Sequence, residues 1–509
     1  MGTKNLNSAA DLITFTRASG GTALRKISYG SELVTNGTFD SDSDWTKGTG
    51  WTIDSGVATH SGTVASNLRQ SPFTVGKTYQ VSWEQTGGQY VAVYGNSLAT
   101  LLKNTNSDGI HKITFTPTST NVLDFRTNSD GANIDNVSVK EVTFDQPDGT
   151  LQLFNSPANV PRIEYNADGT VKGLLIEEAR TNLLSYSEDF SNGAWATPYL
   201  TVGTGVTAPD GTTASSRLTV STNSSTHLYP SARSSTIGVT YSTSVFVKAN
   251  THNIVQLNVP STSSIFVNFN LTTGAKGTEN NCTASIQSVG DGWYKCSITW
   301  VSTSTSNSFG FSIVNNITSG RTTPTIAGYS VYIYGAQTEA GAFPTSYIPT
   351  TGATATRAAD VASIPTANFG YNSDAGTVLV DAQSSSGNIN SMVASLEAVG
   401  DNRIEVRFNG SLNTNARGTI VSNGAVQASL EITGLNEQRK IAFAFTSNDF
   451  ALSANGSAVL SDTSGTLPTV TKMDIGEATY NNSHLNGHIK SIKYYPRRLS
   501  NTQLQELTT

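Results

Sequence analysis

The sequence predicts an all-β protein of three β-sandwich domains in series, with one short helix near its C-terminal end. Apolar and polar residues alternate with a period of two along the chain, as in Arg403–Phe408, and helical periodicity is nearly absent. Asp-Gly and Asn-Gly pairs, for example at positions 210 and 455, mark turns between the strands. A sheet with one apolar face must bury that face against a second sheet, so these patterns favour sandwiches.

The composition agrees with this fold class. At 509 residues the chain is too long for one core. Only 13% of its residues are charged and 37% are hydrophobic, with 45 glycines. The many Ser, Thr and Asn residues predict a neutral polar exterior, which suits sugar binding and is ordinary for an extracellular particle.

Several functional classes are disfavoured. The net charge is −6 and no basic stripe exists, so we expect no nucleic-acid partner. The longest apolar runs, such as Ile441–Phe445, fall far short of a bilayer, so no membrane insertion is expected. The first residues lack the apolar region of a signal peptide, and Sec export is therefore not expected.

Two segments carry a resemblance to a known group of proteins. They are Lys172–Phe190 (KGLLIEEARTNLLSYSEDF) and Gly335–Ala359 (GAQTEAGAFPTSYIPTTGATATRAA). Together they closely resemble modules that recur in the head-spike and tail-fibre structural proteins of tailed bacteriophages. The resemblance implies a sandwich over residues 181–360, a homotrimer, and a place on the exterior of the virion after synthesis in the bacterial host cytoplasm.

The first block, residues 31–142, resembles a jelly-roll carbohydrate-binding module at its opening (Glu32–Asp40) and its ending (Ile134–Val139). Phe15–Ser19 and Asn159–Arg162 resemble pieces that lie close together in sequence in related phage chains. The first block therefore looks like a domain inserted into the lead-in of the second. Residues 1–30 and 143–180 would pair into a small N-terminal β collar that anchors the chain to other virion proteins or trimerises it.

The third block, residues 376–509, follows a linker at 361–375. Its ending, Leu485–Ser500, resembles the last strand of concanavalin-like and laminin-G-like sandwiches. A short helix should follow, with Ser500 as its cap, Gln503 completing a capping box, and leucines 499, 504 and 507 packing back onto the sandwich.

Aromatic residues give the binding hypothesis, because sugar rings stack on Trp and Tyr while their hydroxyls bond to amides, carboxylates and arginine. In the first block the candidate carbohydrate-binding residues are Trp45, Trp51, Arg69, Gln85, Gln89, Tyr90 and Tyr94. In the second block they are Trp195, Tyr199, His227 and Tyr229. The alternative is that most of them are core residues, since aromatic side chains dominate sandwich interiors.

Charged residues do not indicate catalysis. A glycosidase needs two carboxylates that face each other across a sugar, and the adjacent Glu177 and Glu178 point to opposite faces of a strand. With Arg180 they are better explained as positioning a linker. No common catalytic motif occurs, so we expect no enzyme and no cofactor. Asp40 and Asp135 are candidates for a structural calcium, with ordinary turn-forming aspartate as the alternative.

Cys282 and Cys296 flank an apparent hairpin. Two buried thiols are the expectation and a disulfide is the alternative, because a one-residue slip in register would place them on opposite faces. The bacterial cytoplasm also favours free thiols.

The sequence therefore predicts a virion fibre or spike subunit that binds host-surface polysaccharide without catalysis. Two alternatives stay open. One is a head fibre that decorates the capsid without a specific ligand, and the other is a tail-spike polysaccharide depolymerase.

Overall fold

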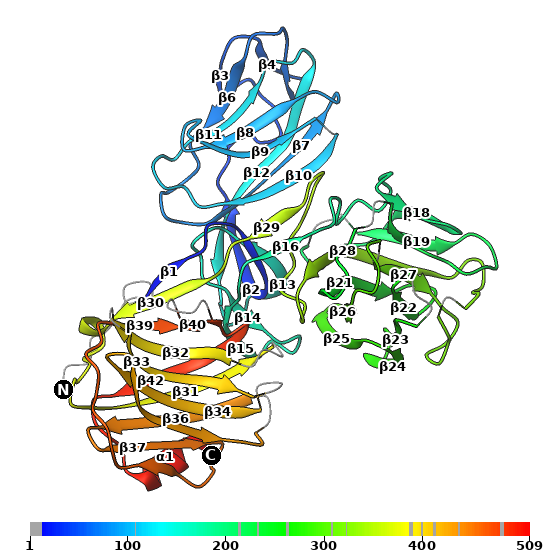
Figure 1. Cartoon of the computed structure of the whole chain (residues 1–509). Coiled ribbons are helices and arrows are strands. Elements are labelled where there is room, and N and C mark those ends of the chain that lie inside the picture. Colours follow the sequence, from blue (N-terminus) through cyan, green and yellow to red (C-terminus); the bar gives the residue numbers. More distant parts are fainter. Residues whose placement is uncertain are drawn as a thin grey trace. The chain divides into compact units, whose positions relative to one another are not determined.

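The computed structural model describes residues 13–106, 108–211, 215–231, 234–260, 264–306, 309–321, 323–385, 390–398, 401–410, 414–435, 438–478 and 483–509. Antiparallel strands dominate this part of the chain, with a single α-helix, α1 (Asn501–Thr508) (Figure 1). The prediction of an all-β fold with a short C-terminal helix is confirmed. The chain divides into two compact units, one of Arg25–Thr150 with Asn155–Pro157 and the other of the remaining residues.

The first unit is a sandwich of two sheets. The larger sheet contains, in spatial order, β10 (Gly109–Phe115), β7 (Tyr79–Thr86), β12 (Ala132–Phe144), β2 (Gly21–Glu32) and β13 (Thr150–Ser156), with β4 (Trp51–Asp54) and β5 (Val57–His60) beside β12. The other contains β3 (Thr46–Lys47), β6 (Ser66–Gln70), β11 (Leu123–Thr127), β8 (Val91–Gly95) and β9 (Thr100–Thr105). Tyr79, Val81 and Trp83 alternate into the core between them, as the sequence predicts.

The other unit contains a middle sandwich and a C-terminal sandwich. The larger middle sheet runs β18 (Leu200–Thr204), β19 (Ser216–Val220), β28 (Ser330–Ala340), β21 (Thr240–Ala249), β26 (Trp293–Val301) and β25 (Thr283–Gly290). The smaller runs β24 (Ala275–Asn280), β23 (Phe266–Asn270), β22 (Ile254–Asn258) and β27 (Gly310–Ile313). Two short pairs, β17 (Trp195–Ala196) with β20 (Tyr229–Pro230) and β16 (Arg180–Asn182) with β29 (Ala355–Arg357), complete it.

The C-terminal sandwich has two seven-stranded sheets. One runs β1 (Thr14–Thr16), β30 (Val361–Pro365), β39 (Lys472–Ile475), β32 (Asn390–Ala398), β33 (Asn402–Asn409), β34 (Asn415–Ser422) and β35 (Ala425–Ile432). The other runs β14 (Ile163–Tyr165), β15 (Val171–Ile176), β42 (Gly487–Tyr495), β31 (Ala375–Ser384), β36 (Gln438–Thr446), β37 (Asp449–Ala454) and β38 (Leu460–Asp462). The pair β40 (Glu477–Ala478) and β41 (Ser483–His484) and a 3₁₀ turn at Thr366–Asn368 lie outside these sheets.

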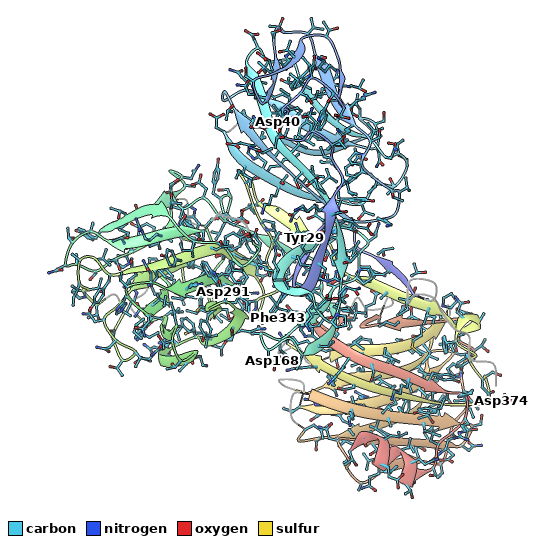
Figure 2. All side chains as sticks on the ribbon, turned by 180° about the vertical axis from the view of Figure 1, so that it is seen from behind. Tyr29, Asp40, Asp168, Asp291, Phe343 and Asp374 are labelled. Atoms are coloured by element: carbon cyan, nitrogen blue, oxygen red, sulfur yellow. The ribbon has the colours of Figure 1, made fainter. Side chains whose placement is uncertain are left out.

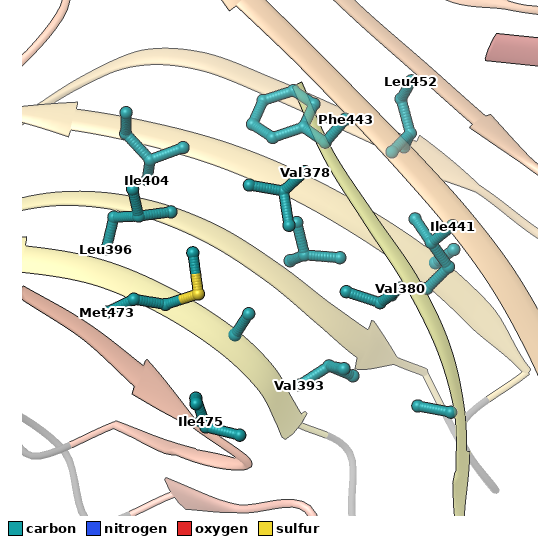
Figure 3. Packing of buried hydrophobic residues seen from close by; sticks show 14 of the residues in the cluster. Val378, Val380, Val393, Leu396, Ile404, Ile441, Phe443, Leu452, Met473 and Ile475 are labelled. Carbon is teal, nitrogen blue, oxygen red and sulfur yellow. The ribbon is translucent and has the colours of Figure 1, made fainter. Parts of the chain in front are cut away.

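The predicted alternation explains the core of the C-terminal sandwich. Val378, Val380, Ile404, Ile441 and Phe443 point into the space between its two sheets (Figure 3). All five are fully buried, and each such side chain stabilises the fold by roughly 1.5–3 kcal/mol relative to exposure. Ile404 alternates with polar neighbours, whereas Leu379 and Ala442, which separate the other two pairs, face the opposite side of the sheet and are buried against α1.

The terminal helix forms as the sequence predicts. The hydroxyl of Ser500 accepts a hydrogen bond from the backbone N–H of Gln503 at 3.3 Å, and the side chain of Gln503 accepts one from the backbone N–H of Ser500 at 3.0 Å. Leu499 and Leu504 are buried against β31, β36 and β37, and Leu507 packs beside them. The capping box is confirmed.

The segments predicted to form a collar are distributed among several sheets. Strands β2 and β13 are neighbours in the larger sheet of the first sandwich. Strand β1 pairs with β30, and the β14–β15 hairpin pairs with β42, so both extend sheets of the C-terminal sandwich. Across the described residues, no helix is long and apolar enough to span a bilayer.

Candidate functional site

The outer face of the five-stranded sheet in the first sandwich carries a row of polar side chains. On β11, Leu123 and Phe125 point into the core, so Asp124 and Arg126 point to the opposite face. Asp124 lies directly opposite Tyr94 of β8 on one side and opposite Arg69 of β6 on the other. Residues directly opposite on neighbouring strands share a face. Tyr94, Asp124 and Arg69 therefore form one row across three strands.

A second row lies two residues along the same strands, about 7 Å away. There Arg126 is directly opposite Asn67 of β6 and donates a hydrogen bond from Nη1 to its Oδ1 at 2.8 Å. We call the two rows together the first-sandwich face; it consists of Asn67, Arg69, Tyr94, Asp124 and Arg126. Its outline, three strands wide and two rows deep, is about 10 Å by 7 Å, the size of one or two sugar rings.

The carboxylate of Asp124 holds the neighbouring arginine of this face in place. Arg69 donates from Nε to Asp124 Oδ1 at 2.8 Å, and its side chain is 36% exposed while that of Asp124 is fully buried. Burial raises the pKa of Asp124, and the positive charges of Arg69 and Arg126 only partly counteract this effect. The carboxylate thus fixes the guanidinium of Arg69 in a partly exposed position.

The first-sandwich face has hydrogen-bonding groups that the protein does not use. The described part of the chain provides no partner for the terminal nitrogens of Arg69, the amide nitrogen of Asn67 or the hydroxyl of Tyr94. Oδ2 of Asp124 is buried without a hydrogen bond as well. Polar groups in such positions are normally satisfied by water or by a ligand.

The structure divides the aromatic and polar candidates of the first block into two groups. Arg69 and Tyr94 lie on the first-sandwich face, and Tyr90, just before β8, is 41% exposed. Gln89 is half-buried in the turn before Tyr90, and its carbonyl accepts from the side chain of Gln85 at 2.6 Å.

Three candidates of the first block are interior residues, which corrects the sequence-based assignment. Trp45 is buried with its ring 5.3 Å from that of Phe39, and Trp51 is buried against His60 at the same distance. Gln85 is fully buried and bonded to backbone carbonyls. None of the three can present a surface to a sugar, since a stacking ring must have an open face.

The middle sandwich also divides its candidates. Trp195 is buried and donates from Nε1 to the carbonyl of Tyr186 at 2.8 Å, so it is a core residue, contrary to expectation. Tyr199 is 51% exposed. His227 and Tyr229 are half-buried with ring centroids 6.3 Å apart, and they lie on the outer side because Leu228 between them enters the core.

A row of amides lies on the same outer side of the middle sandwich. Val255, Leu257, Val267 and Phe269 fill the core, so their neighbours Gln256, Asn258 and Asn268 face outward. All three are nevertheless fully buried.

The cover over these amides is the chain's own segment 315–321. Asn268 donates to the carbonyls of Ile317 and Ser319 at 3.1 and 2.6 Å, and Gln256 donates to that of Gly320 at 3.1 Å. This amide row is closed to ligands by the protein itself.

Of the charged cluster singled out in the sequence, Glu178 and Arg180 pair with each other, and Glu177 belongs to a buried ion-pair network. Glu177 lies 2.9 Å from Arg162 and 3.6 Å from Arg357, and Asp360 pairs with Arg17 at 3.0 Å and with Arg162. Burial raises the pKa of Glu177, but the positive charges of Arg357 and Arg162 outweigh this effect and lower the pKa to about 2. The network joins the N-terminal segment, the β15 region and the chain after β29, so its role is structural.

The residues proposed for calcium make local contacts. Asp40 lies on a loop of the first sandwich (Figure 2) and accepts from the hydroxyl of Thr38 at 2.7 Å. Asp135 accepts from the backbone and side chain of Asn136. Searching the described residues finds no group of three or more His, Cys, Asp or Glu side chains that could hold a metal ion. The calcium interpretation stays a prediction.

Sequence reasoning missed Asn67, Asp124 and Arg126. The alternation in Leu123–Thr127 contains the signal for two of them, because it places Asp124 and Arg126 opposite the apolar Leu and Phe. What it lacks is the register that brings them beside Arg69 and Tyr94.

Comparison with solved structures finds β-sandwich proteins at low similarity. The CBM40 of the Ruminococcus gnavus IT-sialidase is 16% identical over 27% of this chain and 84% of its own, with a TM-score of 0.24. The CBM22-1–CBM22-2 tandem of Paenibacillus barcinonensis Xyn10C is 10% identical over 61% of this chain and 98% of its own, with a TM-score of 0.23. Domains LG4–5 of the mouse laminin α1 chain are 9% identical over 55% of this chain and 88% of their own length, with a TM-score of 0.21.

No protein-family model and no curated protein matches the chain. At TM-scores this low the structural likenesses carry no weight for function.

Proposed function

We propose that this chain is a non-catalytic glycan-binding adhesin and that the first-sandwich face is its binding surface. The observation that carries the proposal is the row of Tyr94, Asp124 and Arg69, where partly exposed donors have no protein partner. Sugars present hydroxyls that need such donors and acceptors, and C–H faces that stack on an aromatic ring.

Each side chain of the face has a role in this proposal. The ring of Tyr94 supports the apolar face of a sugar, and the guanidinium of Arg69 donates two parallel hydrogen bonds to neighbouring hydroxyls. The amide of Asn67 bonds the next ring. A shallow face of this kind binds one sugar weakly, so adhesion depends on several copies acting together.

The resemblance of Lys172–Phe190 and Gly335–Ala359 to phage spike and fibre modules supports the biological setting. In this setting the chain is a homotrimeric fibre or spike subunit on the exterior of a tailed-phage particle. Its N-terminal segment attaches to other virion proteins, and its sandwiches bind host-surface polysaccharide. Many trimers on one particle multiply the residence time of a weak contact.

The absence of catalysis is part of the proposal. Asp124 is a single carboxylate held by arginine, whereas glycoside hydrolysis uses a pair of opposed carboxylates about 5–9 Å apart. A polysaccharide depolymerase is therefore disfavoured.

The test is a glycan array and a host-cell binding assay with purified full-length protein. Tyr94→Ala and Arg69→Met should each reduce binding at least tenfold. The matched control is Tyr29→Ala, because Tyr29 is an exposed tyrosine of the same sandwich that belongs to the other sheet. Equal losses in the control and the face variants would refute the assignment. No binding to any glycan or cell would favour a capsid decoration, and released oligosaccharide would favour a depolymerase.

A further inference from the structure

A cavity of about 110 Å³ lies in the larger unit, beside the β14–β15 hairpin. Its apolar wall includes Leu24 and Phe246, both almost fully buried, and Phe343, which is labelled in Figure 2. Its polar side is lined by Lys172 and Lys295 among other residues. An apolar wall opposed by a few convergent polar groups is the usual construction of a small-ligand pocket.

Lys295 brings to this cavity an ammonium group that has no directly paired carboxylate. Its ammonium donates to the backbone carbonyl of Thr345 at 2.7 Å, and in the described part of the chain no carboxylate lies within 4.0 Å of it. Burial lowers its pKa, although the negative charges of Glu339, Glu177 and Glu164 act in the opposite direction. A half-buried ammonium with two unused donors is a ready partner for an anion.

The carboxylates near the cavity already have partners. Glu164 accepts from Nε2 of His488 at 2.5 Å and lies 3.4 Å from the ammonium of Lys172. Burial raises the pKa of Glu164, but its hydrogen bond to His488 and the nearby cations lower the pKa overall. Glu177 is held by two arginines of the buried network. Lys295 is therefore the lining lysine that has no ion-pair partner among the described residues, although Glu164 and Glu177 also line the cavity.

The cavity opens toward hydroxyl-binding groups. Gln287 and Ser385 are exposed lining residues, and neither side chain has a hydrogen-bond partner in the described chain. A second hollow of about 450 Å³ shares Lys172 and His488 with the first, so a longer ligand can continue there. A cavity of about 150 Å³ holds one benzene ring, so this smaller cavity admits the carboxylate end of a sugar while the rest of the ring extends out through the opening.

We propose that this cavity binds the terminal acidic residue of a polysaccharide, a uronic acid, with its carboxylate on Lys295. The ring hydroxyls meet Gln287 and Ser385. The C–H face of the sugar lies against Phe246. The sugar nature of the ligand rests on the proposed function, whereas the carboxylate site rests on the ammonium of Lys295 and its unused donors.

The test is isothermal titration of the full chain with sodium glucuronate, glucose, acetate and phosphate. Glucuronate should bind, glucose should bind at least tenfold more weakly, and Lys295→Met should reduce glucuronate affinity at least tenfold. Lys295→Arg keeps the charge and should retain binding, which separates loss of the ligand contact from misfolding. The control is Lys493→Met, an exposed lysine on β42.

Three results would overturn the proposal: equal affinity for glucose and glucuronate, equal affinity for acetate or phosphate and glucuronate, or an unchanged affinity in Lys295→Met. Tyr94→Ala should leave glucuronate binding intact. Glucuronate binding without any binding on the glycan array would refute adhesion by the first-sandwich face and leave the cavity site standing. Array binding without glucuronate binding would refute the cavity site alone.

Discussion

The replacement Glu477→Gln should stabilise the C-terminal sandwich above neutral pH and have little effect under acidic conditions. Glu477 lies on β40 and is only 6% exposed, and its Oε1 has no hydrogen bond. Its charged neighbours are Asp474, Lys472 and Glu397. His484 is the residue directly opposite it in the register of the β40–β41 pair. Lys472 is already shared between Asp474 at 2.8 Å and Glu397 at 3.1 Å, so one cation serves three carboxylates.

The sign and size of the effect follow from the pKa of Glu477. Burial raises it from 4.5 to about 7, and the charge of Asp474 adds to this rise. A carboxyl group with a raised pKa binds its proton more tightly in the folded state, so the free energy of unfolding falls as pH rises from about 4.5 through about 7. At about 1.4 kcal/mol per pKa unit, the loss between pH 5 and pH 8 is about 2–3 kcal/mol. Glutamine mimics the protonated form and avoids this loss.

Hydrogen exchange measured by mass spectrometry is the suitable assay, because all six tryptophans precede residue 301 and fluorescence would miss this sandwich. Peptides from β36 and β37 report its opening, and comparing variant with wild type at one pH cancels the intrinsic exchange rate. At pH 8 the variant should exchange at least tenfold more slowly, and at pH 5 the difference should shrink to a factor of about four. The control, Glu506→Gln, removes an exposed carboxylate of α1. Equal exchange at pH 8, or a gain independent of pH, would refute the reasoning.

Three further predictions follow from buried and local contacts. Asp360→Ala should destabilise the larger unit by about 3–5 kcal/mol, measured by thermal denaturation, because it leaves Arg17 buried without its carboxylate. Cys282 and Cys296 are free thiols, and burial raises the pKa of Cys282 to about 11 and that of Cys296 further. Iodoacetamide at neutral pH should therefore label both cysteines only after unfolding. A native disulfide between them would contradict this prediction. Adding EDTA should leave the melting temperature unchanged, because Asp40 makes the local contact with Thr38 that is typical of a turn-forming aspartate; a marked fall would instead support a structural calcium.

The fold was predictable because its information is local. Alternation in Arg403–Phe408 alone assigns Ile404, Val406 and Phe408 to the core, and all three are fully buried. The helix was predictable for the same reason, since Ser500 and Gln503 are three residues apart and cap each other.

The buried network was beyond local reasoning. Arg17 and Asp360 meet across 343 positions of the sequence, and no pattern within either segment specifies that pairing. The burial of Trp45 and Trp51 was not predicted for a related reason. Trp45 lies outside the named strands and Trp51 begins a four-residue strand, so too little alternation surrounds them to assign a face. Both nevertheless pack into the core of the first sandwich.

The two sandwiches show why hydrogen-bond partners locate a binding face better than aromatic residues do. Both carry polar side chains on the outer side of a sheet. In the middle sandwich, Gln256 and Asn268 use their donors on carbonyls of segment 315–321, so nothing remains for a ligand. In the first, the carboxylate of Asp124 holds Arg69 through one nitrogen and leaves its other two without a protein partner among the described residues. A polar group that is half-exposed, positioned and still unpaired gains most from a bound hydroxyl, and that property is fixed by strand register rather than by residue type.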